Sequence, residues 1–495
     1  MKAILPVLDP TRSMPLYLQL YHYIRESILS GEIREGEKLP SLRSLASSLA
    51  LSLTTISAAY EQLEVEGYIT SRPQSGYYVR RIPSVFSGIA GMPPQNPYSR
   101  RSSESANSKP ANGESVQPAP FPESPGRIEA AAPTPAMPSA ASATSPATPS
   151  ATPFLYDLAC FDFTKWKKCM SQVFTEHADQ LMFESDPQGE LSLRQELSRY
   201  LYSARGVFCD PSQIVIGAGT QQIAGSLSLI LAHNGIRHAV VEDPGYLPVR
   251  NILRDRGFAV TPVAVDENGI RIEKLPINIR TAAYINPGNQ FPTGAVTPIG
   301  NRYRLLSWAL ANDSFIIEDD YDSELRYTGR PIPPLKSLDT ANRVIYLGSF
   351  SSTLFASVKI SYMVLPEPLS EIFHEIKNDY TQTCSKAEQL TLAAFMQRGL
   401  YQINIKKLRT LYAQKLQHLL ASVHRYGAGF ITPLNTASGI NITLRVSSGK
   451  TPETLAAEAA SLGIRVLPVD FPAAQSGMGD GIWSGAESGV EDGIC

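Results

Sequence analysis

The chain has 495 residues, a net charge of −2 and a hydrophobic fraction of 43%. This length permits two or three domains, and the composition lets most of the chain bury a core. Because the net charge of the chain is not basic, it does not by itself indicate a nucleic-acid partner. DNA binding would have to depend on a local surface. The opening residues, MKAILPVLDPTRS, lack the apolar core of a signal peptide, and no apolar run reaches membrane-spanning length. We therefore expect a soluble, cytoplasmic protein with no membrane partner.

Five cysteines are scattered along the chain at irregular intervals. Their odd number and the absence of a pair at metal-ligand spacing favour reduced thiols over a disulfide framework or a metal site. We therefore expect no bound metal.

Composition divides the chain into four segments. Residues 10–80 and 154–472 have ordinary globular composition, whereas residues 81–153 are dominated by Pro, Ser and Ala. Such a segment cannot bury enough apolar surface to offset its ordering entropy, which predicts a disordered linker. Residues 473–495 are rich in Gly and Ser and contain no Arg or Lys, which predicts a disordered tail.

Apolar residues in the first segment recur with the spacing of three successive helices. In residues 15–31 they recur every four residues, and Gly31 suits the C-terminal end of a helix. In residues 39–50 and 51–67 they fall at i, i+3, i+4 and i+7. Residues 68–79 then predict a β-hairpin. Periodicity alone leaves a small helical domain with solvated serines open as an alternative.

Three helices followed by a hairpin make a winged helix-turn-helix, in which the N-terminal end of the third helix reads the major groove of DNA. The small polar side chains there would meet base edges, and the arginines would hold phosphate or read guanine. The residues expected to contact double-stranded DNA are Ser41, Arg43, Ser52, Thr54, Thr55, Ser57, Arg72 and Gly76.

Residues 15–79 closely resemble the DNA-binding domain of the GntR family. Three elements carry the resemblance: LPSxR at 39–43, YxxLxxEGY at 60–68 and the SG pair at 75–76. One residue departs from the family, which usually has Arg directly after the serine that opens the third helix, where this chain has Leu53. The resemblance therefore implies DNA binding with one basic contact missing.

From residue 190 onward, β-rich runs alternate with helical patterns. This alternation predicts a parallel, doubly wound α/β sheet, and ligands of such sheets lie at the carboxyl ends of the strands. The polar runs that follow the expected strands are 219–221, 243–246, 286–294, 319–322 and 349–352.

Together these runs resemble the fold-type I pyridoxal-phosphate enzymes of the class I/II aminotransferase group. VEDPGY, NQFPTG, IIEDDYDSELRYTGRPIPPLKSLD and VIYLGSFSSTLF are most similar to the MocR subfamily, regulators that join a GntR domain to an aminotransferase-like domain through a long linker. The implied fold is an N-terminal winged helix-turn-helix (α+β) joined by a disordered linker to an α/β fold-type I aminotransferase-like domain.

The resemblance implies a role for each polar run around pyridoxal 5′-phosphate. A cofactor phosphate is held by N–H groups at a helix N-terminus, by hydroxyls and by a cation, and the pyridine nitrogen needs a carboxylate partner. Asp319 is expected at that nitrogen, Tyr321 at the ring phenolate and Tyr246 against the ring face. The implied cofactor-binding set is Gly219, Thr220, Gln221, Tyr246, Gln290, Asp319, Tyr321, Ser349, Ser351, Ser352 and Lys359, with Asn289 as a further polar contact.

One residue of that set lacks the chemistry of an aminotransferase. Such an enzyme needs a lysine amine, which forms a Schiff base with the cofactor and then moves a proton. In the family this lysine lies in SFSKTL, whereas residues 349–354 here read SFSSTL, so that Ser352 occupies the position. Lys359 occupies the place of an Arg that binds the cofactor phosphate in the family, and the tail lacks the expected Arg for a substrate carboxylate.

We therefore predict a DNA-binding transcriptional regulator without catalytic residues. Its aminotransferase-like domain would dimerise the chain. It would also bind pyridoxal 5′-phosphate or an amino-acid-like effector, non-covalently at most, or would serve only for dimerisation. A homodimer would present two DNA-binding domains to two half-sites. Two alternatives stay open: a working pyridoxal-phosphate-dependent aminotransferase, and a decayed regulator without function.

Overall fold

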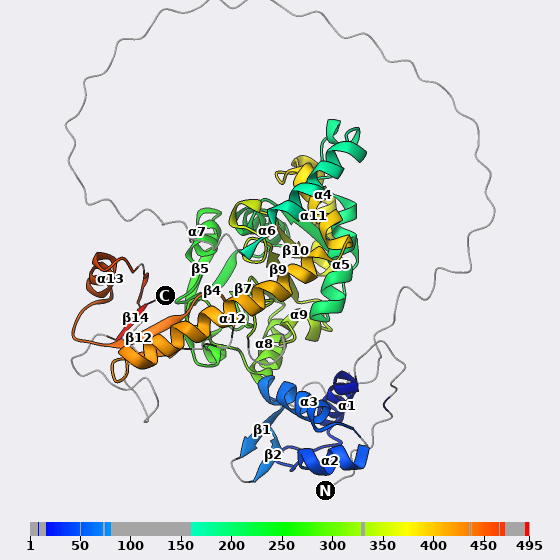
Figure 1. The fold of residues 1–495 in the computed structure, drawn as a ribbon. Helices are drawn as coiled ribbons and strands as arrows, with labels where there is room; N and C mark the ends of the chain where they lie inside the picture. Colours follow the sequence, from blue (N-terminus) through cyan, green and yellow to red (C-terminus); the bar gives the residue numbers. More distant parts are fainter. Residues whose placement is uncertain are drawn as a thin grey trace, which may run out of the picture. The chain divides into compact units, whose positions relative to one another are not determined.

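The computed structural model describes residues 8, 16–49, 51–72, 75–80, 160–327, 332–434, 436, 438–464, 466–470 and 491–494 (Figure 1). The linker expected at 81–153 lies outside these residues. Among the described residues, no helix combines the length and apolarity needed to cross a membrane.

The N-terminal domain is a three-helix unit followed by a hairpin, as the sequence predicts (blue in Figure 1). Its periodic apolar residues are buried, including Leu20, Ile24, Ile56 and Leu63, all 0% exposed. The hairpin strands pair antiparallel, with Arg72 opposite the glycine that opens the second strand. The elements are α1 Leu16–Leu29, α2 Leu42–Leu49, α3 Leu53–Val65, β1 Ile69–Arg72 and β2 Gly76–Val79.

The C-terminal domain is built on an eight-stranded sheet with the order β3-β10-β9-β8-β7-β4-β5-β6. Strands β9, β8, β7, β4 and β5 are parallel, as expected, but β10 runs antiparallel to both of its neighbours and β6 antiparallel to β5. The sheet is therefore mixed rather than purely parallel. Its strands are β3 Ile214–Gly217, β4 His238–Asp243, β5 Ala259–Asp266, β6 Gly269–Ile270, β7 Thr281–Ile285, β8 Phe315–Asp319, β9 Val344–Ser349 and β10 Ser361–Val364.

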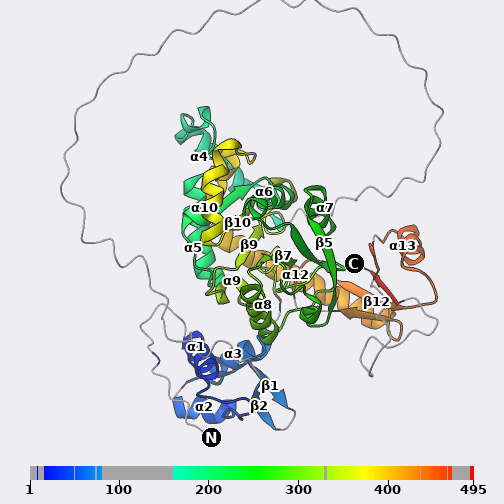
Figure 2. The same cartoon turned by 180° about the vertical axis from the view of Figure 1, so that it is seen from behind.

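Alternate residues of the central strands face opposite sides of the sheet, so each strand contributes to two cores. On β3, Ile214 and Ile216 pack with α4, α5, α11 and α12, whereas Val215 packs with α6, α7 and α10. Helices thus cover both faces of the sheet, as the views from the two sides show (Figures 1 and 2).

The helices of the C-terminal domain precede, connect and follow these strands. They are α4 Phe163–Glu176, α5 Leu191–Arg205, α6 Thr220–His233, α7 Leu247–Asp255, α8 Ile299–Ala311, α9 Leu335–Leu338, α10 Glu367–Ile376, α11 Lys386–Gln397, α12 Leu400–Tyr426 and α13 Pro452–Ser461. Short 3-10 turns lie at Gln180–Met182, Pro211–Gln213, Ile272–Lys274, Ala356–Val358 and Lys377–Asp379.

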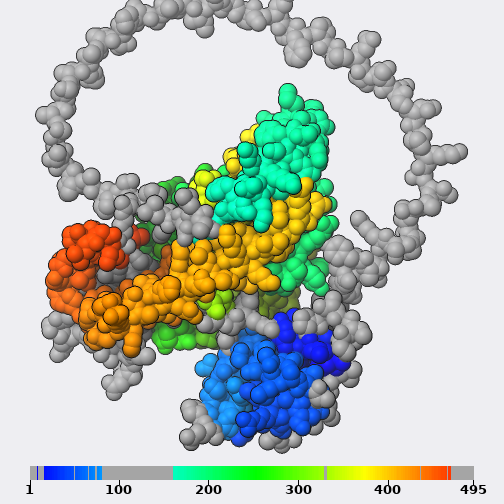
Figure 3. Space-filling model, viewed as in Figure 1, coloured from blue at the N-terminus to red at the C-terminus, as the bar shows by residue number. Residues whose placement is uncertain are grey.

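The long helix α12 leads from the large sheet to a second, smaller sheet with the order β11-β12-β14-β13. It forms a ridge across one face of the domain (gold to orange in Figure 3). The strands are β11 Ile431–Leu434, β12 Thr443–Ser447, β13 Pro468–Asp470 and β14 Glu491–Ile494. An irregular tail was expected for residues 473–495, yet Glu491–Ile494 pair with β12 and β13, and residues 471–490 lie outside the described part.

Candidate functional site

Side chains from several strands meet at one edge of the large sheet, which we call the strand-end site. Strands β4, β7, β8 and β9 are parallel, so their carboxyl ends lie along the same edge. The end of β3 joins them because Gly217 and Ser349 both pair with Ser361, the first residue of β10. The polar runs that the sequence placed after strands are therefore brought together.

One end of the strand-end site gathers groups of the kinds that bind phosphate in proteins. Gly219 caps the N-terminus of α6 with a positive φ of 91°, a conformation that favours glycine. A Cβ at that glycine would lie 3.8 Å from the Cδ of Lys359, so the lysine side chain runs beside the helix N-terminus. Ser349 Oγ accepts hydrogen bonds from Ser351 N at 3.3 Å and from Ser361 Oγ at 3.0 Å. Helix N–H groups, hydroxyls and a cation thus surround this point.

The other end of the strand-end site is centred on Asp319, the last residue of β8. The hydroxyl of Tyr284 donates to its carboxylate, and Asn286 Nδ2 donates to its backbone oxygen at 2.9 Å. Burial raises the pKa of Asp319 to about 6, against the hydrogen bond from Tyr284. Burial and the negative charge of Asp319 raise the pKa of Tyr246, while a hydrogen bond with Gln221 lowers it. Tyr246 therefore lies near Asp319 and also contacts Gln221 in the first turn of α6.

Ser352 lies on the connection that follows β9. Its Oγ donates to the backbone oxygen of Tyr321 at 2.8 Å. Asn289 Nδ2 donates to the hydroxyl of Tyr321 at 3.4 Å and to Asp322 Oδ2 at 2.8 Å. Burial raises the pKa of Asp322 well above its usual range.

Gln290 holds its own loop together. Its Nε2 donates to Pro244 O at 2.8 Å and to Phe291 O at 2.6 Å, and its Oε1 accepts from Thr293 N at 3.1 Å. The side chain is 1% exposed. The amide that the sequence assigned to a cofactor contact is thus engaged within the protein.

A buried network of hydrogen bonds and an ion pair holds the residues beside the strand-end site in place. Arg205 on α5 pairs with Asp320 at 2.5 Å, and both side chains are 4% exposed. On α12, Asn404 Nδ2 donates to Thr353 O at 2.6 Å, and the Tyr401 hydroxyl lies 3.1 Å from Thr353 Oγ1. The loop that carries Ser352 is therefore fixed to the helix that leads to the smaller sheet.

A residue from the connection between β11 and β12 closes over the site. Gly439 N donates to Leu325 O at 2.9 Å, and its oxygen accepts from the Tyr327 hydroxyl at 2.6 Å. A Cβ at Gly439 would lie 2.5 Å from Asn289 Nδ2 and 2.6 Å from Asp322 Oδ2. Only glycine lets the backbone at residue 439 come this close to Asn289 and Asp322.

We expect Gly439→Ala to destabilise the C-terminal domain. Its φ of +85° alone costs an alanine about 1–2 kcal/mol, and the new methyl group must also displace Asn289 or Asp322. The free energy of urea unfolding measures the loss. Gly449→Ala is the matched control, because a Cβ there meets nothing within 4 Å. Equal stabilities of the two variants would contradict the close approach.

Glu242 at the end of β4 predicts a pH dependence of stability. Burial raises its pKa from 4.5 to about 8, although Asn286 N and Gln290 Nε2 donate to it. Because the folded state holds this proton more tightly, the contribution to stability is full below pH 4.5 and is lost as pH rises through about 8. We expect Glu242→Gln to flatten this part of the pH profile of urea unfolding. An unchanged slope would contradict the buried carboxyl.

The N-terminal domain presents the expected DNA-contacting residues at its surface. Ser52 is the N-cap of α3, and its Oγ accepts from Thr55 N at 3.1 Å. The exposed Arg72 guanidinium lies 4.4 Å from the centre of the Tyr78 ring, which fixes the arginine on the hairpin. Leu53, at the position of the missing arginine, is 48% exposed.

The other expected residues of this surface have identifiable local partners. Ser41 Oγ accepts from Ser44 N at 3.2 Å at the start of α2, beside the exposed Arg43. Ser57 Oγ donates to Glu61 at 2.9 Å, whereas Thr54 is exposed. Gly76 opens β2 with a φ of 108°.

Sequence reasoning missed several residues that the structure brings into the strand-end site. Tyr284 lies inside a buried strand, where nothing in the sequence marks it as the partner of Asp319. Asp322 and Asn286 fell within the polar runs but had no assigned role. Gly439 comes from the smaller sheet, about 150 residues after its neighbour Asn289 along the chain, and only tertiary structure brings the two together.

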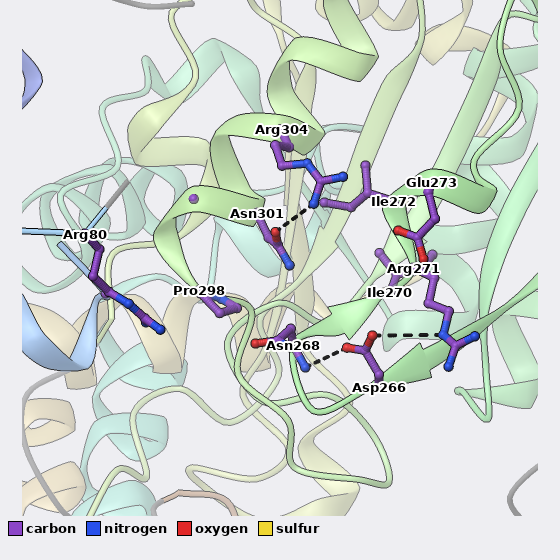
Figure 4. Close-up of a pocket in the computed structure, with 12 residues that line it drawn as sticks. Arg80, Asp266, Asn268, Ile270, Arg271, Ile272, Glu273, Pro298, Asn301 and Arg304 are labelled. Carbon is purple, nitrogen blue, oxygen red and sulfur yellow. Dashed lines mark hydrogen bonds and ion pairs between the residues drawn. The ribbon is translucent and has the colours of Figure 1, made fainter. Parts of the chain in front are cut away.

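A surface pocket away from the strand-end site is polar and internally paired. Figure 4 shows its lining, which comes from Arg80 after the hairpin, from β5, β6 and the turn after β6, and from the start of α8. Asp266 pairs with Arg271 at 3.9 Å, and Arg304 donates to Asn301 at 3.2 Å (Figure 4). In the part of the chain that the structure describes, no group of three His, Cys, Asp or Glu side chains could hold a metal ion.

Comparison with protein families identifies both domains. Residues 16–79 match the bacterial regulatory proteins of the gntR family, and residues 155–468 match aminotransferase class I and II. The solved structures similar to this chain include a kynurenine aminotransferase from Pyrococcus horikoshii, with a TM-score of 0.56 and 22% identity over 63% of this chain and 78% of that chain. An archaeal alanine:glyoxylate aminotransferase has a TM-score of 0.57 and 21% identity over 68% and 83%. These likenesses establish the fold.

Relatives along the full chain are regulators. The uncharacterized HTH-type transcriptional regulator YdeL of Bacillus subtilis is 36% identical over 94% of this chain and 92% of its own. The probable rhizopine catabolism regulatory protein MocR of Rhizobium meliloti is 29% identical over 94% and 88%. The pyridoxine biosynthesis transcriptional regulator PdxR of Corynebacterium glutamicum is 29% identical over 99% and 96%.

The family resemblance supports pyridoxal 5′-phosphate as the group that the strand-end site binds. The residues present fit it at two points. The α6 N-terminus, the serine hydroxyls and Lys359 suit a phosphate, and Asp319 suits a pyridine nitrogen. Both domains, in this order, are those of one class of regulators. The chain belongs to the GntR-family transcriptional regulators that carry a class I/II aminotransferase domain, as MocR does.

Proposed function

We propose that this protein is a dimeric, operator-binding regulator whose aminotransferase-like domain is not catalytic. In this proposal the domain senses pyridoxal 5′-phosphate or a chemically related ligand through non-covalent binding. The observation that carries the proposal is Ser352, at the position where the family has its reactive lysine. A hydroxyl cannot form a Schiff base, and a transamination cannot begin without one.

The geometry around Lys359 supports the same conclusion. This lysine lies beside the N-terminus of α6, where its Cδ is 3.8 Å from a Cβ built at Gly219. An amine that neutralises the phosphate is not free to take the role of the missing lysine. The direct test mixes the protein with pyridoxal 5′-phosphate, an amino acid and a keto acid. We expect no transamination product, and steady turnover would refute the proposal.

Exposed apolar side chains favour self-association. Phe174 is 56% exposed, Met182 83% and Phe183 73%, all on or just after α4. Exposed apolar side chains of this kind suit burial against a second copy of the chain. Light scattering on the purified protein tests this. We expect twice the chain mass of 54.0 kDa, and a monomer at micromolar concentration would contradict the dimer.

Specific DNA binding is tested by gel shift on the DNA upstream of the protein's own gene. We expect a shift that an excess of unrelated DNA of the same length does not abolish. The exposed N-terminus of α3 and the arginine held on Tyr78 support this expectation. If no specific shift is seen even at low salt, the alternative of a decayed regulator is favoured.

We expect Leu53→Arg to strengthen DNA binding. Leu53 is exposed beside the α3 N-terminus, so an arginine there can reach a phosphate or a base. A new phosphate contact steepens the salt dependence of the binding constant by about one unit in a log–log plot. Titrations at several salt concentrations measure the slope. Leu462→Arg is the control, because this leucine is 79% exposed after α13 in the other domain.

A further inference from the structure

We propose that the exposed face of helix α12 is a second DNA-contacting surface, which binds the phosphate backbone beside the operator without reading its sequence. We call this face the α12 ridge and define it by its four exposed cations, Lys406, Lys407, Lys415 and Arg425. The inference goes beyond the proposed function, in which the N-terminal domain alone contacts DNA. Figure 3 shows α12, in gold to orange, standing open along one face of the C-terminal domain.

The charge of the chain around α12 has one sign only. Residues 389–452 contain eight Lys or Arg and no Asp or Glu, although the whole chain has more acidic than basic residues. With 46 acidic residues in 495, a segment of this length would ordinarily hold about six. A helix face that is merely solvated usually mixes both signs, as Arg199 and Glu196 do on α5. The absence of acid around α12 therefore favours an anionic partner over an ordinary solvated face.

The geometry of α12 places these cations on the side away from the domain. Its buried residues, such as Leu408, pack against the large sheet's helices and loops, whereas Lys407 and Arg425 are exposed. These two residues are eighteen positions apart, which is five turns of 3.6 residues, so they lie on one line of the helix about 27 Å apart. Lys406 and Lys415, both exposed, lie to either side of that line. The ridge is therefore a straight row of positive charge.

The positive charge of the ridge is not compensated by the protein. Among the described residues, no acidic side chain forms an ion pair with Lys406, Lys407 or Arg425. The Arg425 guanidinium lies 5.2 Å from the centre of the Tyr426 ring, which holds it at the surface. Arg409, by contrast, is half-buried and donates to a backbone oxygen, so it is not part of the ridge. The exposed cations are therefore available to an external anion.

DNA is the polyanion that the same chain brings to the ridge. The N-terminal domain matches a family of DNA-binding regulators, and joining two surfaces in one chain makes the second contact intramolecular. A duplex presents about 16 phosphates along the roughly 27 Å of the ridge. Residues 1–80 contain eight basic and eight acidic residues, so the N-terminal domain has no net attraction for DNA of its own. A lipid surface fits less well, because the apolar face of α12 is buried within the domain.

Fluorescence anisotropy on the full chain tests the ridge with two duplexes. One is the shortest DNA upstream of the protein's own gene that the protein still binds, and the other extends it at each end by about 15 unrelated base pairs, which is longer than α12. The ridge variant combines Lys406→Gln, Lys407→Gln and Arg425→Gln. We expect the natural protein to bind the extended duplex more tightly and the ridge variant to lose at least about tenfold there, with a salt slope smaller by about 2–3 units. On the short duplex the two proteins should agree within about twofold.

The matched control combines Arg199→Gln, Arg254→Gln and Lys274→Gln, which removes three exposed cations from elsewhere in the same domain. We expect it to bind both duplexes as the natural protein does. Equal affinity of the natural protein for the two duplexes, or an equal loss in the ridge and control variants, would overturn the proposal. So would a ridge variant that loses binding to vesicles of anionic lipid and keeps its affinity for the extended duplex.

Failure of the ridge and failure of the proposed function give different results. If the natural protein binds neither duplex specifically, operator binding by the N-terminal domain is refuted. The ridge is then judged on an unrelated duplex of the extended length at low salt, where the ridge variant should still show the smaller salt slope. An unchanged slope there refutes the ridge. Because glutamine is a good helix former and the three positions are exposed, we expect the ridge variant to unfold in urea as the natural protein does.

Discussion

We expect Ser352→Lys to form a covalent bond to pyridoxal 5′-phosphate and the natural chain to form none. The side chain of Ser352 is only partly buried, which leaves room for a lysine stem. Its loop is fixed by Asn404 and Tyr401, so the new amine would be held close to Tyr321 and Asp319. Lys359, as a cation for the cofactor phosphate, and Asp319, as a carboxylate for the pyridine nitrogen, complete the surroundings that imine formation needs.

The measurement is a visible absorbance band that survives gel filtration, followed by borohydride reduction and mass spectrometry of the modified peptide. We expect the label on the new lysine in Ser352→Lys and no label in the natural protein. Ser352→Met, of similar length without an amine, is the matched control. Labelling of Lys359 in the natural protein would refute both the assignment of Ser352 and the phosphate role of Lys359.

The second large effect concerns Arg205, which neutralises Asp320 in the interior. Both side chains are 4% exposed, and the Tyr346 hydroxyl also donates to Asp320. Removing one partner of such a pair leaves a buried charge without compensation, which costs about 3–5 kcal/mol. We therefore expect Arg205→Leu to lower the free energy of unfolding of the C-terminal domain by about that amount.

Urea unfolding followed by tryptophan fluorescence measures this loss, since Trp166 and Trp308 lie in the C-terminal domain. Arg199→Leu is the control: Arg199 lies on the same helix, is 62% exposed and pairs with Glu196. Exposed pairs contribute about 0–1 kcal/mol, so the control should stay close to the natural protein. Because Asp320 follows Asp319 directly, we also expect Arg205→Leu to weaken ligand binding at the strand-end site.

Much of the fold could be predicted from local sequence patterns. The i, i+4 apolar spacing of α1 and the serine that caps α3 were predicted and are present. Strands β3, β4, β7, β8 and β9 lie where the β-rich runs placed them, because each run is buried on both faces and reads as continuously apolar. The antiparallel strand β10 escaped prediction, since strand direction depends on the connection that precedes it rather than on composition.

The same division holds for the site. By resemblance, the sequence predicts that Ser352 takes the place of a lysine and that Asp319, Ser349 and Lys359 are available to a cofactor, because these are matters of residue identity after a strand. Tertiary structure decided how each one is used. The Ser352 hydroxyl donates to the backbone oxygen of Tyr321, and the Gln290 amide donates to the backbone of a neighbouring loop. Gly439 reaches Asn289 from a distant sheet, and no local pattern encodes a contact between segments that far apart.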